Sequence, residues 1–186
     1  MTSLREIRPG DRDQMLQWRN LPSVREYMHT DHIISPEEHA AWFSRIQKDP
    51  TSKYWIIVCD GEDVGVVNLS GIEPLHRRCY WGFYLASPNL RGKGVGSYVE
   101  YTILNYVFDV LHLEKLCGEV LSFNENVLAM HRGFGFVQEG VLRKHIFKSG
   151  KSYDVVTIGI LQEEWDARRP EQELKLRAKG IIEAGT

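Results

Sequence analysis

The chain has 186 residues, of which 42% are hydrophobic and 26% charged, and this balance predicts a single globular domain with a substantial core. The net charge of −2 offers no overall field that would attract nucleic acid or a membrane, so any phosphate recognition must be local. The N-terminus has no secretory apolar region, and the three cysteines form no C-x-x-C pair. We therefore expect a cytoplasmic protein that binds neither nucleic acid nor membrane and holds no metal.

The first half of the chain predicts a strand, then helices, then an antiparallel run of strands. Residues 3–8 alternate apolar and polar side chains, which is typical of a half-buried strand. Ser35-Pro36-Glu37-Glu38 has the residue types of a helix start, with proline in the first turn. We expect helices after Asp11, over 24–28 and after Ser35, and strands over 3–8, 54–59, 64–69 and 78–85.

The second half alternates strands and helices. We expect an amphipathic helix within 98–111, a strand over 115–121, a short helix over 124–132 and a hairpin of 141–147 with 153–161. This order predicts an α/β fold with a mixed, mostly antiparallel sheet and helices on both faces. We place one domain over residues 1–165 and expect 166–186 to be a charged, helical and peripheral or partly disordered tail.

A glycine-rich loop lies between the strand 78–85 and the helix that follows. Strand, glycine turn and helix together point backbone N–H groups and the positive end of the helix dipole at an anion. Arg91 and Lys93 add positive charge, and Ser97 can cap the helix. The spacing R-x-x-G-x-G differs from the dinucleotide-binding and Walker patterns. An ordinary glycine-rich turn is the alternative interpretation.

This loop resembles the acyl-CoA pyrophosphate loop of the GNAT (GCN5-related) N-acetyltransferases, and the order of elements matches that family over about residues 3–162. The resemblance implies acetyl-CoA as co-substrate and direct transfer to an amine without an acyl-enzyme. It also implies that the strands on either side of the loop and its helix part to admit the pantetheine arm. The implied cofactor-binding residues are Tyr84, Leu85, Ala86, Arg91, Gly92, Lys93, Gly94, Val95, Gly96, Ser97 and Asn124.

Two of these assignments depend on particular groups. A backbone N–H of residues 84–86 would polarise the thioester carbonyl. Asn124 would contact the pantetheine amide, although an asparagine there could equally be the N-cap of the next helix.

Glu119 is a carboxylate inside the otherwise apolar strand 115–121. Burial in a central strand would raise its pKa and suit it to accept a proton from the attacking amine through a water. The alternative is an edge-exposed glutamate, or one paired with an arginine. His131 stands where the family pattern N-x(10)-G-F places the tyrosine that protonates the departing thiolate; it could donate that proton or simply pack there.

Aromatic and basic residues gather in the N-terminal half, in W-R-N at 18–20, then V-R-x-x-M, then E-H-x-x-W at 38–42. Several of them at helical spacing are typical of a core. The pattern is also similar to GNATs that acetylate UDP-4-amino-4,6-dideoxy-N-acetyl-β-L-altrosamine in pseudaminic acid synthesis for flagellin glycosylation. That resemblance implies diphosphate contacts from Arg19 and His39, and a nucleotide pocket of Met28, Trp42 and Tyr84. Asn68 falls where a relative carries serine, so its part in binding the catalytic water stays open.

Other acceptors remain. Ribosomal-protein N-terminal acetyltransferases share much of the W-R-N and E-x-x-W character, and polyamine acetyltransferases have the same fold. A CoA-binding module that has lost its acid is a third possibility, suggested only by His131. We expect a monomer or a homodimer.

Overall fold

The computed structural model describes residues 1–90 and 92–183. In these ranges it forms a seven-stranded sheet in the order β1-β2-β3-β4-β5-β7-β6. Neighbouring strands are antiparallel except for the parallel pair β4 and β5, which confirms the predicted mixed sheet. The strands are β1 (Thr2–Glu6), β2 (Lys53–Cys59), β3 (Glu62–Glu73), β4 (Arg78–Leu85), β5 (Lys115–Leu121), β6 (Val137–Lys148) and β7 (Lys151–Leu161).

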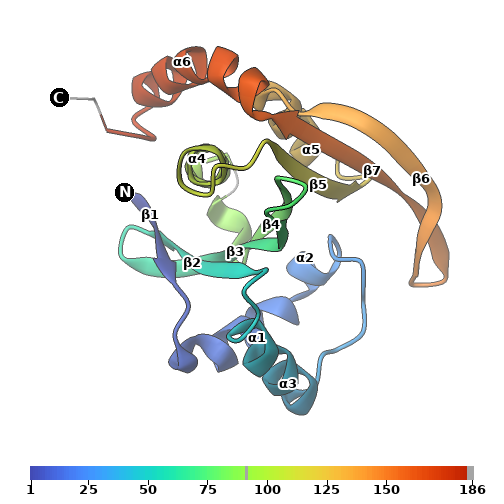
Figure 1. The fold of residues 1–186 in the computed structure, drawn as a ribbon. Helices are drawn as coiled ribbons and strands as arrows, with labels where there is room; N and C mark the ends of the chain where they lie inside the picture. The colour runs from blue at the N-terminus through green and yellow to red at the C-terminus, as the bar shows by residue number, and fades with distance from the viewer. Residues whose placement is uncertain (91, 184–186) are drawn as a thin grey trace.

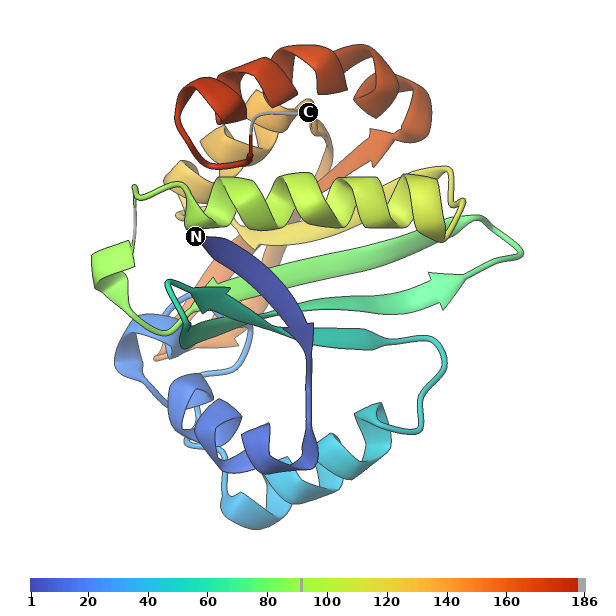
Figure 2. The same ribbon diagram turned by 90° about the vertical axis from the view of Figure 1, so that its left-hand side faces the viewer.

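Helices cover both faces of this sheet (Figures 1 and 2). On one side lie the short helices near the N-terminus, and on the other α4 lies between the sheet and α6. The helices are α1 (Arg12–Arg19), α2 (Pro22–Arg25), α3 (Pro36–Ile46), α4 (Val95–Asn105), α5 (Glu125–Phe134) and α6 (Gln162–Ala178), with the turns η1 (Pro9–Asp11), η2 (Pro88–Leu90) and η3 (Tyr106–Val110). None of the helices in the described ranges carries an apolar run long enough to cross a membrane.

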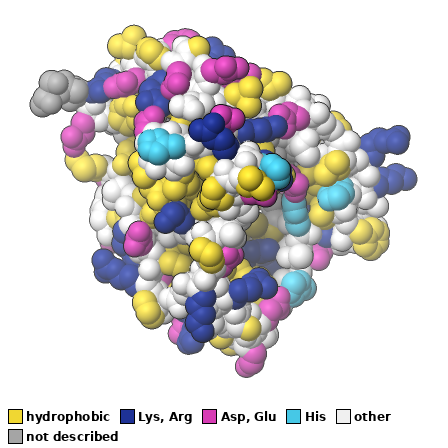
Figure 3. Space-filling model, viewed as in Figure 1, with side chains coloured by type: hydrophobic (Ala, Val, Ile, Leu, Met, Phe, Trp, Pro, Cys, Tyr) yellow, Lys and Arg dark blue, Asp and Glu magenta, His cyan; other side chains and the backbone are white. Residues whose placement is uncertain are grey.

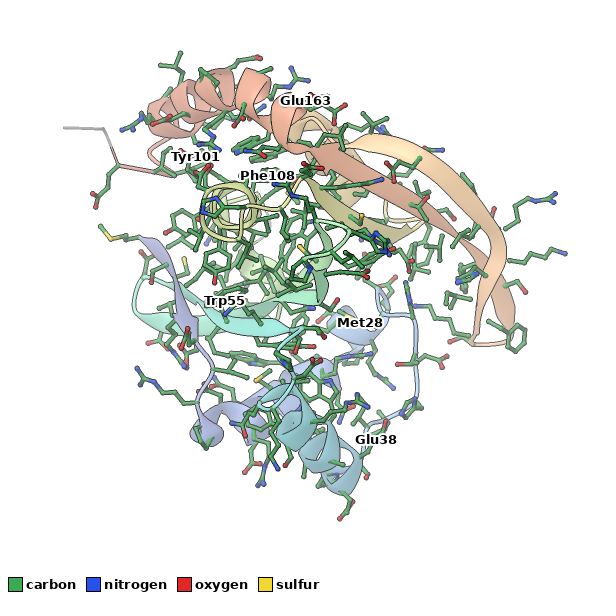
Figure 4. All side chains as sticks on the ribbon, in the orientation of Figure 1. Met28, Glu38, Trp55, Tyr101, Phe108 and Glu163 are labelled. Carbon is green, nitrogen blue, oxygen red and sulfur yellow. The ribbon has the colours of Figure 1, made fainter. Side chains whose placement is uncertain are left out.

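Side chains that alternate along the central strands build a core on each face. Ile56 and Val66 belong to the core under α1 and α3, whereas their neighbours Ile57 and Val67 belong to the larger core under α4–α6. All four are nearly inaccessible to solvent, as expected for strands that are covered on both sides. In Figure 4, Phe108 lies in the larger core, beside the end-on view of α4.

Helix α6 corrects the expectation of a peripheral tail. Trp165, Gln172 and Leu176 lie on one helical face, at i, i+7 and i+11, and are all buried. The indole Nε1 of Trp165 donates to Asn105 Oδ1 at 3.0 Å, and Gln172 Nε2 donates to the Gly133 carbonyl at 2.6 Å. The many charges of this segment concealed a narrow buried stripe that packs on the core.

The sheet opens at its centre. The parallel pairing of β4 and β5 joins Arg78 to Lys115, Cys79 to Leu116 and Tyr80 to Cys117, and in the described part of both strands it stops there. Beyond this point β4 continues to pair with β3, and β5 with β7. The two strands therefore part over their C-terminal halves, as the family resemblance implied.

Candidate active site

The glycine loop ends at the N-terminus of α4. Gly92 and Gly94 have φ angles of +78° and +83°, which favour glycine. Gly94 is the N-cap of α4, and the N–H groups of the helix's first turn have no partner within the helix. These N–H groups and the helix dipole make this N-terminus a candidate anion site, and the exposed side chain of Lys93 beside it adds positive charge.

The loop contains two further residues that were predicted to bind the cofactor, Ser97 and Arg91. Ser97 is not the cap: the helix begins at Val95, so Ser97 is its third residue and contributes a backbone N–H instead. Gly94 takes the cap position because the chain enters the helix with a positive φ. Arg91, which we predicted to contact pyrophosphate, lies outside the described residues.

Gly96 serves packing. A Cβ added at this position would lie 3.3 Å from the Met130 sulfur and 3.4 Å from the Phe83 ring. The missing side chain therefore lets α5 and β4 approach the first turn of α4 closely, next to the anion site.

At the edge of β4 that parts from β5, one backbone N–H of residues 84–86 is free to donate, as predicted for a single donor there. The Ala86 N–H donates to the Val64 carbonyl at 2.8 Å, so it is not available to a thioester. Tyr84 pairs with Val66 two residues earlier in the same ladder. Because N–H groups alternate in direction along an antiparallel strand, the N–H of Leu85 is the one that faces the opening.

A cleft of about 1100 Å³ lies between α1, α3, the loop after α2 and the sheet. Figure 3 shows a hollow in this face, with histidine and basic side chains near it, and Figure 4 shows Met28 on the loop toward the sheet and Glu38 farther out on α3. The cleft brings together seven residues predicted from the sequence: Arg19, Met28, His39, Trp42, Asn68, Tyr84 and Glu119.

Two nitrogens on the cleft's lining residues are buried without a hydrogen-bond partner in the described part of the chain, Arg19 Nη1 and His39 Nδ1. Arg19 Nη2 donates to Thr30 Oγ1 at 3.0 Å, and the His39 ring lies 5.0 Å from the Trp42 ring. Burial lowers the pKa of both Arg19 and His39. An unpaired buried polar group is costly. Arg19 Nη1 can only donate, so this wall offers a donor to an acceptor atom, whereas His39 Nδ1 donates or accepts according to the tautomer of its ring.

Glu119 lies in the cleft but is not buried as expected; its side chain is exposed. The reason is the parting of the sheet. Glu119 pairs with Thr157 of β7, whereas its other side faces the opening left by β4. The pKa of nearby His29 is lowered by burial, and the Glu119 carboxylate opposes that shift.

Tyr84 lines the cleft with a half-buried phenol. Burial raises its pKa, and the Arg19 guanidinium counteracts this in part. The phenol is therefore neutral near pH 7 and can donate a hydrogen bond. Asn68 of β3, which pairs with Gly82 of β4, is another polar residue of the sheet that lines the cleft.

His131 lies on the opposite face of the sheet and is 5% exposed. Its Nδ1 lies 2.8 Å from Oε1 of Glu100, a fully buried carboxyl on α4. Burial raises the pKa of Glu100, and His131 counteracts this in part. The other oxygen, Oε2, has no partner among the described groups, and the His131 ring contacts Trp81 edge-on at 5.3 Å.

Sequence reasoning missed Glu100, although a signal was present. Glu100 shares one helical face with Ile103, Leu104 and Val107, at i, i+3, i+4 and i+7, and all three are buried. A carboxylate on an apolar stripe needs a buried partner, and His131 supplies it.

Asn124 is at the N-cap position of α5, but its side chain makes no capping bond with any described group. Its backbone N–H donates to the Leu121 carbonyl at 2.8 Å. The capping alternative is therefore not realised, and the half-buried amide stays available to a ligand. Within residues 1–90 and 92–183 no three His, Cys, Asp or Glu residues gather as metal ligands; the expectation that the protein needs no metal stays a prediction.

Comparison with known proteins agrees with this geometry. The model of the acetyltransferase (GNAT) domain matches residues 2–137, and the chain therefore belongs to the GNAT acetyltransferases. It is an acetyl-CoA-dependent N-acetyltransferase.

The names of some relatives give spermidine as the acceptor, whereas the name of another gives none. Spermidine N(1)-acetyltransferase of Escherichia coli K12 is 29% identical over 163 residues, which cover 86% of this chain and 87% of that protein. Acetyltransferase PseH of Campylobacter jejuni is 30% identical over 118 residues, covering 63% of this chain and 71% of that protein. The structure of spermidine N-acetyltransferase from Vibrio cholerae with CoA and spermine has a TM-score of 0.82 at 24% identity and covers 88% of this chain and 97% of that one. The last comparison shows the fold.

Proposed function

We propose that this enzyme acetylates the 4-amino group of a UDP-linked amino sugar, UDP-4-amino-4,6-dideoxy-N-acetyl-β-L-altrosamine, in pseudaminic acid synthesis for flagellin glycosylation. The observation that carries the proposal is the pair of unpaired nitrogens, Arg19 Nη1 and His39 Nδ1, in the described wall of the cleft. A diphosphate would give Arg19 Nη1 an acceptor, in a hydrogen bond strengthened by charge, and it would also give His39 one in the tautomer whose proton is on Nδ1. Met28, Trp42 and Tyr84 would enclose the nucleotide.

The residues present fit acetyl-CoA. The first turn of α4, with its glycines and Lys93, would hold the pyrophosphate, and the opening between β4 and β5 would take the pantetheine arm. The Leu85 N–H would donate to the thioester carbonyl, and Asn124 would contact the pantetheine amide. The thioester supplies the acetyl group.

Glu119 is the proposed base. An alkylamine is protonated near neutral pH and must lose a proton before it can attack. A carboxylate exposed within the cleft can take that proton through a water, which Asn68 would help to hold. Transfer is proposed to be direct, because Cys117, the cysteine nearest to Glu119 in the sequence, is buried and its pKa is raised by burial, which keeps the thiol a poor nucleophile.

His131 is the proposed proton donor to the departing thiolate. Its Nδ1 is engaged by Glu100, which leaves Nε2 as the nitrogen that can donate. His131→Gln keeps a hydrogen-bonding side chain beside the buried Glu100 but removes the ionisable proton. We expect kcat to fall with little change in the KM for either substrate, and unchanged kcat would assign the residue to packing.

A polyamine acceptor is the second candidate. The similarity to spermidine N(1)-acetyltransferase covers 86% of this chain, and Glu38 and Glu119 line the cleft. Against it, Arg19 and Arg45 line the same cleft and would repel a polycation. The two arginines and two glutamates of the described lining balance in charge, so the preference for an anionic acceptor rests on the unpaired buried nitrogen of Arg19.

An acceptor panel tests the proposal. Thiol release from acetyl-CoA is measured with the UDP-4-amino sugar, spermidine and a ribosomal N-terminal peptide. We expect the highest kcat/KM for the UDP-4-amino sugar, and transfer only to spermidine or the peptide would overturn this acceptor. Glu119→Gln should lower kcat/KM at neutral pH by roughly 10²–10⁴-fold, whereas the exposed, distant Glu62→Gln should not. Full activity of Glu119→Gln would remove Glu119 as the base.

A further inference from the structure

We propose that Lys148, at the tip of the β6–β7 hairpin, is a positioning residue. It holds in place the loop after α2, residues 26–31, which forms the acceptor side of the cleft. The inference rests on the proposed function only in taking the cleft as the acceptor site. In Figure 1 the hairpin extends from the sheet toward the loop that follows α2. Lys148 is distant from this loop in the sequence and is not among the residues that line the cleft.

The Lys148 ammonium is bound by backbone carbonyls. Nζ donates to the Met28 carbonyl at 2.8 Å, to the Glu26 carbonyl over a short distance, and weakly to that of Arg25 at 3.5 Å. The carbonyls of Glu26 and Met28 follow α2, beyond its last helical hydrogen bonds. The carbonyl of Arg25, the last residue of α2, also accepts from the Met28 N–H at 3.0 Å. Although lysine is rarely buried, Lys148 is 6% exposed.

Aromatic rings close the rest of the ammonium's surroundings. Nζ lies 5.6 Å from the centroid of the Phe123 ring and 5.8 Å from that of Tyr153, which is cation–π distance. The two rings contact each other at 5.2 Å, and Tyr27 of the loop contacts Phe123 at 5.9 Å. The loop is thus joined to the end of β5, just before Asn124.

The far end of the loop is attached to the same hairpin tip. Ser149 donates from both its backbone N and its Oγ to Asp31 Oδ2, each at 2.7 Å. Arg25 Nη1 donates to the Asp31 carbonyl at 2.9 Å. Residues 26–31 are therefore held at both ends by Lys148 and Ser149, whereas the loop belongs to no strand of the sheet.

The loop forms one wall of the cleft. Met28, His29 and Thr30 all line it, and Thr30 Oγ1 accepts from Arg19 Nη2 at 3.0 Å. A shift of the loop would therefore also release the guanidinium of Arg19. From this chain of contacts we infer that Lys148 fixes the acceptor wall and Arg19 without contacting the acceptor.

Lys148→Met tests this role, because it keeps the aliphatic stem and removes the ammonium. With the best acceptor of the panel, we expect the acceptor KM to rise roughly tenfold or more, as for the loss of charged hydrogen bonds. The KM for acetyl-CoA should be nearly unchanged. Lys148→Arg, which keeps the charge and donors, should restore part of the loss, and the exposed Lys151→Met on the same hairpin should behave as wild type.

Amide hydrogen exchange gives a readout that needs no acceptor. In Lys148→Met, exchange within residues 26–31 should accelerate, while α4 and the sheet keep their protection. This arm holds even if the nucleotide-sugar acceptor is wrong, so the two proposals fail separately. Unchanged exchange in the loop, or equal rises in the KM for acceptor and acetyl-CoA with protection lost throughout, would overturn the positioning role.

Discussion

Arg19→Met is the most direct perturbation of the proposed acceptor site. One guanidinium nitrogen, Nη1, is buried without a partner in the described structure, and Nη2 is held by Thr30. Burial lowers the pKa of Arg19, but a guanidinium stays charged near neutral pH. A hydrogen bond to a charged group contributes about 1.5–3 kcal/mol. Its loss should therefore lower kcat/KM for the UDP-amino sugar by roughly 10- to 150-fold.

The assay is steady-state thiol release with matched acceptors and a matched control. An amino sugar without the diphosphate should lose little, and spermidine turnover should be unchanged or raised because a repelling charge is gone. Arg143→Met, at an exposed position of β6 outside the cleft lining, should behave as wild type. An equal loss for acceptors with and without phosphate would refute diphosphate recognition by Arg19.

Three further substitutions test other parts of the structure. Burial raises the pKa of Glu100 above its ordinary 4.5, so between 4.5 and the raised pKa the folded state binds more protons than the unfolded state. The free energy of unfolding should therefore fall as pH rises through this range. Glu100→Gln should flatten that pH dependence in urea titrations. In Gly94→Ala the new Cβ would lie 2.6 Å from the Ile181 side chain, at a residue with positive φ. This substitution should lower the free energy of unfolding by about 1–2 kcal/mol and weaken acetyl-CoA binding in calorimetry. Gly10→Ala, whose Cβ meets nothing within 4 Å, is the control and should do neither. Trp165→Ala should lower the free energy of unfolding by about 3–5 kcal/mol. The control is Leu174→Ala, which should have little effect because Leu174 is 71% exposed. A loss below about 1 kcal/mol at Trp165 would show that α6 contributes little to the core.

The fold was predictable because its signals are local. Alternating strands, a glycine loop and a helix after it can be recognised within short windows, and β4 and β5 have the predicted bounds. The prediction that Ser97 caps the helix was wrong, because the cap is Gly94 and its positive φ leaves no side-chain signal in the sequence. The apolar pattern predicted one continuous helix within 98–111. In the structure the α-helix ends at Asn105 and a π-helical turn, η3, follows from Tyr106.

The site depended on contacts that no window contains. The burial expected for Glu119 assumed that a central strand has a neighbour on each side, and it is wrong because β4 parts from β5 after Tyr80. The Glu100–His131 pair joins two helices across a core. Lys148 lies just past the predicted strand 141–147, where the sequence suggests no buried partner, yet carbonyls of the loop after α2 bind its ammonium. In each case the decisive partner lies far away in the sequence.

The parting of β4 and β5 also separates the two proton transfers of the proposed reaction. Side chains alternate across a strand, so Tyr84 and Glu119 face the cleft, whereas Trp81 and the His131 beside it lie in the core on the α4–α5 side. The amine would lose its proton to Glu119 on one face, and the thiolate would receive one from His131 on the other. A base and an acid on opposite faces cannot pass a proton directly to each other. The thioester would lie between them, at the place where β4 and β5 part.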